Sequence, residues 1–75
     1  MAEVLLFEQL TAREYEVLNL IAAGRSNQEI ADQLVVAHST AKWHVRQLYN
    51  KMGVENRSHA VARAISLGIL GSAEA

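Results

Sequence analysis

The sequence lacks cysteine and proline, and it has no long run of apolar residues. Without cysteine, disulfide bonds and thiolate metal ligands are excluded. Without proline, no segment is barred from continuing as a helix, which suits helices joined by short glycine or polar turns. The apolar stretch from Val4 to Phe7 is too short to span a membrane or to form a signal-peptide core. We therefore expect a cytoplasmic protein with no membrane partner.

The charges are few and unevenly distributed along the chain. With 75 residues there is room for one domain, and the net charge of −1 does not by itself suggest a nucleic-acid partner. Residues 1–37, however, hold six acidic and two basic residues, whereas residues 38–75 hold two acidic and five basic ones. This division is expected for a domain with one charged working face, and a scatter of solubilising charges is the alternative.

Capping signals and apolar periodicity predict an all-α fold, and they locate two helices in the first half. The first helix opens at Thr11, three residues before Glu14, which is the spacing of a capping box, and Gly24 ends it. The second opens at Ser26, again three residues before a glutamate, and ends near Leu34. We expect residues 1–9 to be a tether, residues 10–70 the domain and residues 71–75 a tail.

Two further helices are predicted in the second half. The third runs from about Ser39 to Met52 after a tight connection, and Gly53 closes it. The fourth starts at Asn56 or Ser58 and ends near Gly68. The stretch from Ser26 to Met52 is thus a short helix, a tight turn and a longer helix, which makes a helix-turn-helix if the longer helix keeps a free polar face.

The third predicted helix has such a face. Its apolar stripe consists of Ala41, Val45, Leu48 and Met52. Side chains suited to a major groove lie opposite, because lysine and arginine donate to guanine, glutamine pairs with adenine, and an apolar surface can meet a thymine methyl. The base-reading residues predicted on this face, which also includes Asn50, are Lys42, Trp43, Arg46 and Gln47.

Each of these residues also has a simpler interpretation. Trp43 could pack along the helix edge against Lys42 or Gln47, and the basic residues could be ordinary solvated charges.

The edges of the face and the amino ends of the two helices would supply phosphate contacts. The predicted phosphate-contacting residues are Ser26, Asn27, Thr40, Lys51 and Arg57, of which Ser26 and Thr40 could equally be helix caps.

The fourth predicted helix has a surplus of apolar residues. Ala60, Ala64 and Leu67 form one face, and Val61 and Ile65 widen it. Since one buried stripe is enough for a helix in a domain of this size, the surplus suggests a dimer interface at Val61, Ala64 and Ile65. A wide core face is an equal alternative. A helical protein-interaction module that uses this helix is the rival function.

No catalytic or metal-binding arrangement is present in the sequence. His38 and His44 are six residues apart and lie on different helix faces, and His59 belongs to another helix. No Ser/His/Asp set or carboxylate pair offers catalysis. We expect no enzyme activity, no cofactor, no metal and no small-molecule ligand in this domain.

Motif residues recur along almost the whole chain, from about Gln9 to Leu70. They are Leu10-Thr11-x-Arg13-Glu14-x-Glu16-Val17-Leu18, Gly24-x-Ser26-Asn27-x-Glu29-Ile30-Ala31, Thr40-x-Lys42-x-His44-Val45, and Lys51-x-Gly53-Val54 with Arg57. This pattern resembles the LuxR-type helix-turn-helix domain of bacterial transcription regulators. The string from Lys42 to Tyr49 is most similar to the MalT-like large ATP-dependent regulators.

The resemblance implies a bacterial, nucleoid-associated transcription regulator whose four-helix domain binds double-stranded DNA as a homodimer through its last helix. It also implies base-reading roles for Lys42, Trp43 and Arg46, with Thr40, Lys51 and Arg57 near the DNA backbone. Family members usually carry this domain behind a phosphoacceptor, ligand-binding or ATPase module. We therefore expect that an N-terminal regulatory module is absent here if the chain is a fragment, and a stand-alone regulator is the alternative.

Two residues depart from the family pattern. Ala37 stands where a capping serine is usual, so the third helix should start less sharply, at a cost of about 1 kcal/mol. Ala41 stands where valine is usual, which reduces the core beneath the third helix. Neither residue belongs to the predicted reading face.

Overall fold

The computed structural model describes residues 10–68, which form four α-helices and no strand. The all-α prediction is therefore confirmed. The helices are α2 (Ala12–Ala22), α3 (Asn27–Leu34), α4 (His38–Met52) and α5 (Arg57–Ser66). The predicted tether at residues 1–9 and the tail at residues 71–75 lie outside the described residues.

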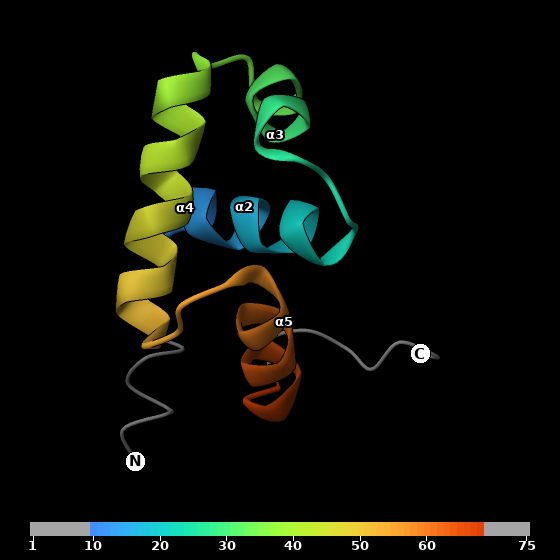
Figure 1. The fold of residues 1–75 in the computed structure, drawn as a ribbon, viewed down its shortest axis with the longest axis vertical. Helices are drawn as coiled ribbons and strands as arrows, with labels where there is room; N and C mark the ends of the chain where they lie inside the picture. The colour runs from blue at the N-terminus through green and yellow to red at the C-terminus, as the bar shows by residue number, and fades with distance from the viewer. Residues whose placement is uncertain (1–9, 69–75) are drawn as a thin grey trace.

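Helices α2 and α4 are the centre of the arrangement, since each of them contacts all three other helices. Figure 1 shows α2 crossing the long α4 near its middle, with α3 on one side of α2 and α5 on the other. Helix α3 packs against α2 and the amino half of α4, while α5 packs against α2 and the carboxyl end of α4. The molecule thus has a helix-turn-helix end and an α5 end.

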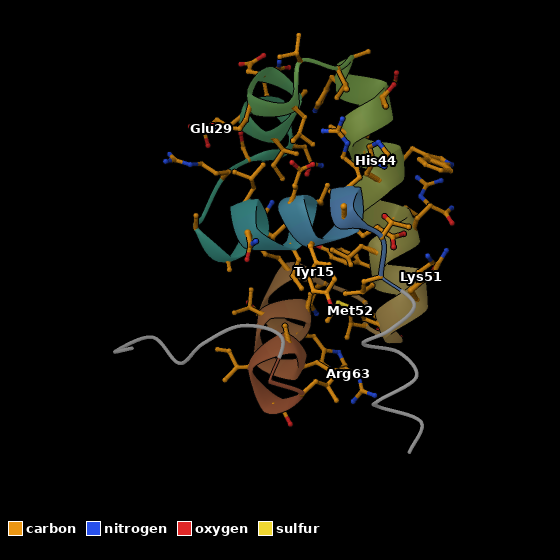
Figure 2. All side chains as sticks on the ribbon, turned by 180° about the vertical axis from the view of Figure 1, so that it is seen from behind. Tyr15, Glu29, His44, Lys51, Met52 and Arg63 are labelled. Atoms are coloured by element: carbon orange, nitrogen blue, oxygen red, sulfur yellow. The ribbon has the colours of Figure 1, made fainter. Side chains whose placement is uncertain are left out.

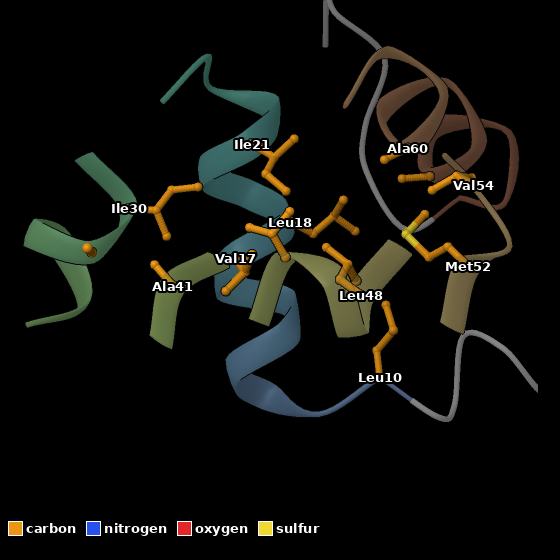
Figure 3. Close-up of a cluster of buried hydrophobic side chains, with 13 residues drawn as sticks. Leu10, Val17, Leu18, Ile21, Ile30, Ala41, Leu48, Met52, Val54 and Ala60 are labelled. Atoms are coloured by element: carbon orange, nitrogen blue, oxygen red, sulfur yellow. The ribbon is translucent and has the colours of Figure 1, made fainter. Parts of the chain in front are cut away.

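The core is one continuous apolar cluster between these helices (Figure 3). Helix α4 contributes its predicted stripe, whose four residues are all buried, so that prediction is confirmed. Helix α5 contributes only small side chains to the fully buried set. The cluster consists of Leu10, Val17, Leu18, Ile21, Ile30, Ala31, Ala41, Val45, Leu48, Met52, Val54, Ala60 and Ala64.

Local capping chemistry sets most of the helix ends. Thr11 and Ser26 each form the predicted capping box, in which the hydroxyl accepts from a glutamate amide and the glutamate accepts from the cap amide. Gly53 ends α4 with a φ of 69°, a left-handed conformation that glycine adopts at little cost. The Asn56 side chain accepts from the amide of His59 at 2.8 Å and starts α5. These predicted boundaries are confirmed.

The turn between α3 and α4 is different, because its residues do not favour the conformation they adopt. Val35 has φ 57° and ψ 51°, the left-handed region that a β-branched residue rarely occupies, and its side chain is 88% exposed. Helix α4 begins at His38, one residue before the predicted start, and its cap residue Ala37 makes no side-chain hydrogen bond. The less sharp start expected from Ala37 therefore corresponds to an uncapped helix.

Candidate nucleic-acid interface

The amino half of α4 presents a polar face to solvent. Buried Ala41 and Val45 hold this half of the helix against α2 and α3. Since side chains four apart in a helix share a face, Lys42 and Arg46 point together away from that core. Both are exposed, as is Trp43 between them. Gln47, the fourth predicted base reader, is half-buried.

Trp43 is a large apolar side chain that remains mostly in water. Its side chain is one of the exposed large hydrophobics of the domain, with 56% of the residue accessible. The ring it meets is that of the neighbouring His44, with the centroids 5.2 Å apart and the planes at 68°, an edge-on arrangement. The half-buried His44, which is labelled in Figure 2, therefore supports the indole from one side. Packing along the helix covers less than half of Trp43.

A hollow of about 370 Å³ lies along this face. Three predicted base readers line it, namely Lys42, Trp43 and Arg46. His38 and Ser39 line it as well, although the sequence prediction did not include them. The signal that could have found them is spacing, because they precede Lys42 and Trp43 by four residues and so lie on the same helix face. His38 was missed because the predicted helix started one residue late, at Ser39, whereas Ser39 lay inside the predicted helix but the predicted face began at Lys42.

The basic residues of the domain fall into two groups according to their partners. In the part of the chain that the structure describes, neither Lys42 nor Arg46 makes a hydrogen bond or ion pair. Two predicted phosphate-contacting residues, in contrast, already have partners within the domain. Lys51 Nζ lies 3.0 Å from Glu14 Oε1, and Arg57 Nη1 donates to the Ile21 carbonyl oxygen at 3.2 Å. Lys42 and Arg46 thus offer free donors on the amino half of α4. The side chain of Arg25, which precedes α3, is also exposed and makes no hydrogen bond or ion pair within residues 10–68.

Glu14 joins the start of α2 to the end of α4 and has a perturbed pKa. Its side chain is buried and accepts from the Thr11 amide at 2.8 Å and from Lys51 Nζ at 3.0 Å. Burial alone would raise the pKa of this carboxyl. The hydrogen bonds from Thr11 and Lys51, together with the ammonium charge, outweigh burial and hold the pKa below its ordinary value of 4.5.

The remaining predicted phosphate contacts lie at two helix starts. The Ser26 hydroxyl is exposed and accepts from the Glu29 amide at 3.1 Å, so it acts as the cap of α3. In return, the Ser26 backbone amide donates to the Glu29 carboxylate at 2.8 Å. This hydrogen bond is the main reason that the pKa of Glu29 is lowered. Asn27 is half-buried in the first turn of α3. Thr40 is exposed in the first turn of α4 but is no cap, because Ala37 occupies the cap position.

The predicted dimer interface on α5 needs a correction. Ala64 is completely buried in the core of its own domain and has no surface left for a partner. Val61 is half-buried and packs against the core, while Ile65 is 38% exposed. Some of the additional apolar residues of this helix thus belong to a wide core face. Ile65 and the edge of Val61 remain accessible to solvent.

Other kinds of site find little support among residues 10–68. No group of three or more potential metal ligands comes together there. Within the same residues, no helix is long and apolar enough to cross a membrane.

Comparison with known families gives a match that covers most of the chain. Residues 8–64 match the family described as bacterial regulatory proteins, luxR family. The match includes the four motif groups and all of the hollow on α4. The narrower likeness to MalT-like regulators stays a prediction, because the match does not separate subgroups.

A solved structure also resembles this chain. It is the crystal structure of the response regulator ChrA in a heme-sensing two-component system, with a TM-score of 0.77 and 36% sequence identity. The alignment covers 81% of this chain and 30% of that one. The chain therefore corresponds to less than a third of the response regulator's length.

Proposed function

Because the chain belongs to the luxR family of bacterial regulatory proteins, and so contains a DNA-binding domain of transcription regulation, we propose that it binds duplex DNA sequence-specifically as a homodimer. In this proposal the amino half of α4 enters the major groove. Lys42 and Arg46 donate to base edges, Trp43 lies against an apolar base surface such as a thymine methyl, and Gln47 contributes from the side.

The observation that carries this proposal is the pair of unpartnered cations in the hollow. Lys42 and Arg46 are exposed, lie one turn apart, and make no hydrogen bond or ion pair within residues 10–68. A half-exposed tryptophan stands between them. Free donors beside an apolar surface on one helix face match what base edges in the major groove offer. Ser26, Asn27 and Thr40 are accessible enough to add phosphate contacts at the rim.

The roles of Lys51 and Arg57 are proposed in a modified form. Each is already bonded within the domain, to the Glu14 carboxylate and the Ile21 carbonyl respectively. An ammonium or guanidinium group carries several donors, so a phosphate can be an additional partner. Their main effect is then to position α4 and α5, and their contribution to DNA affinity is smaller than that of Lys42 or Arg46.

Dimer formation is proposed through the outer side of α5. Ile65 is exposed there and Val61 is accessible at its edge, which offers a small apolar contact for a second copy. Two copies would place their α4 helices in successive major grooves, about 10 bp apart. We further propose that the domain is the output part of a longer cytoplasmic, nucleoid-associated regulator, as its share of the ChrA chain suggests.

The test begins with selection of bound sequences from a random duplex pool. Affinity for the selected site is then measured for Lys42→Ala and Arg46→Ala, each of which should lose about 1–3 kcal/mol of binding free energy. The control is Arg13→Ala on α2, whose exposed side chain pairs with Glu16 at 3.4 Å, and its affinity should stay unchanged. Unchanged affinity in both α4 variants would refute the reading face.

The rival protein-interaction module predicts a different result. If α5 docks a protein and α4 is only a scaffold, backbone amides of residues 38–47 should not shift when duplex is added. The proposal expects large amide shifts in that range, with chemical-shift titration by NMR as the measurement. Selection that enriches no sequence would count against sequence-specific binding itself.

A further inference from the structure

We propose that His38 is a further specificity-determining residue of the DNA-reading surface, and that it reads a guanine beyond the base pair read by Lys42. This inference rests on the proposed function, since it concerns the same surface. It extends the base-reading set by one turn towards the amino end of α4.

The placement of His38 carries the inference. His38, Lys42 and Arg46 follow one another at intervals of four residues, so they form a single row on the helix face. All three line the same hollow, with Ser39 and Trp43 as the adjacent row. His38 is exposed and, within the described residues, makes no hydrogen bond or ion pair. It therefore has free ring nitrogens at the end of the hollow.

The spacing of the row indicates which base pair His38 would meet. A helix rises about 1.5 Å per residue, so four residues separate neighbouring members of the row by about 6 Å. Successive nucleotides of one DNA strand are about 3.4 Å apart along the axis. With α4 lying along the strand that it contacts, His38 would meet a base pair one to two steps beyond the contact of Lys42. The first turn of a recognition helix is also where side chains come closest to base edges.

The chemistry of the imidazole favours a contact with a base over a contact with the phosphate backbone. A ring N–H donor is matched best by guanine, whose N7 and O6 are both acceptors, whereas adenine places the N6 donor beside its N7. The side chain is short, so its reach is limited to the groove surface directly in front of the helix. Long lysine and arginine side chains, in contrast, can follow a phosphate over several ångströms. A short donor in the row should therefore discriminate between bases at one position.

The experiment compares selection from a random duplex pool for the wild-type chain, His38→Ala and His59→Ala. His59 is a matched control, because it is also an exposed histidine and lies on α5, outside the hollow. Alanine is a good helix former, so both variants should keep the fold, and thermal unfolding checks this. We expect His38→Ala to lose a guanine preference of about fivefold at one position, the effect of one hydrogen bond. Preferences at the Lys42 and Arg46 positions should remain, and His59→Ala should match the wild type.

The possible outcomes separate this inference from the proposed function. An unchanged base preference in His38→Ala, with a clear selected site for the wild type, overturns the role of His38 alone. A uniform loss of affinity over all sequences also overturns it, since that result indicates a phosphate contact. A wild-type chain that selects no sequence overturns the proposed function itself. If His59→Ala lost the guanine preference at the same position, the effect would not come from the hollow. That result would equally overturn the inference.

Discussion

The two ends of α4 differ in how their polar groups are used. At the helix-turn-helix end, Val35 is in a left-handed conformation, Ala37 leaves α4 uncapped, and Lys42 and Arg46 have no partner within residues 10–68. At the α5 end, which Figure 2 shows with Lys51 and Arg63 labelled, basic side chains donate to the domain itself. Arg63 Nε donates to the Met52 carbonyl oxygen at 2.9 Å and closes the end of α4.

Within one helix, this difference separates polar groups that stabilise the fold from polar groups that have no partner in the described residues. Helix α5 contributes mainly alanines to the fully buried core, so its attachment depends on the hydrogen bonds of Arg57 and Arg63 as well as on packing. The helix-turn-helix end keeps donors free for a ligand and tolerates a strained turn. Substitutions at the α5 end should therefore destabilise the fold, while some at the other end should stabilise it.

The largest expected change in the free energy of unfolding distinguishes two arginines, one at each end of α4. Arg63→Met keeps the apolar stem but removes the donor to the Met52 carbonyl, and it should lower the free energy of unfolding by about 1–3 kcal/mol. Arg46→Met removes an exposed, unpartnered group and should change it by less than about 0.5 kcal/mol. Urea unfolding of both variants measures the contrast. Equal destabilisation would remove the distinction between the two ends.

A smaller effect is expected from the ion pair of Glu14 with Lys51. The pKa of Glu14 is lowered in the folded chain, so its stabilising contribution is present above pH 4.5 and is lost as the pH falls below that value. Glu14→Gln should cost about 1 kcal/mol at neutral pH and should flatten this part of the pH dependence. Unfolding free energies between pH 7 and 3 test this. A variant with the wild-type acid dependence would contradict the assignment.

At the helix-turn-helix end, a cap should add stability. Ala37→Ser supplies a hydroxyl that can accept from the first-turn amides of α4, so the free energy of unfolding should rise by about 1 kcal/mol. The reverse substitution at the other helix start, Ser26→Ala, should lower it by a similar amount because it breaks the capping box. Thermal unfolding of the pair is the measurement. No gain in stability from Ala37→Ser would mean that the first-turn amides of α4 need no further hydrogen-bond acceptor.

The smallest effect is expected at Val35. Val35→Gly relieves a left-handed conformation that costs about 1–2 kcal/mol, but glycine loses about 0.5–1 kcal/mol in backbone entropy. The net gain in the free energy of unfolding should be about 0.5 kcal/mol, because the exposed side chain gives up little packing. Val36→Gly, at a partly buried position, should instead destabilise the domain. A loss at both positions would mean that Val35 carries no strain.

Local signals were sufficient to predict the helices and much of the exposed polar face of α4. The capping boxes at Thr11 and Ser26, the stop at Gly53 and the buried stripe of α4 depend on neighbours within one or two turns. The partners of Lys51 and Arg57 could not be predicted in this way, since Glu14 and Ile21 lie 37 and 36 residues away along the chain.

Two other features escaped prediction for physical reasons. A β-branched residue does not favour a left-handed turn, so the sequence did not predict one at Val35. In the structure this conformation ends α3 and accompanies a hydrogen bond from the Val36 amide to the Ala31 carbonyl oxygen at 3.0 Å. Helical periodicity placed Ala64 on the same apolar face as its neighbours. Only the packing of α5 on α2 and α4 shows that this residue is inside the core, whereas Ile65 stays partly outside.

The most direct test of the reading face is the indole N–H signal of Trp43 during titration with the selected duplex. The chain contains one tryptophan, so this NMR signal is unambiguous, and the side chain is 56% exposed in the free domain. If the amino half of α4 enters the major groove, the signal should shift strongly and saturate with the complex, while a scrambled duplex produces a smaller change. An indole signal that stays in place when the selected duplex is fully bound would contradict the assignment of this face to DNA.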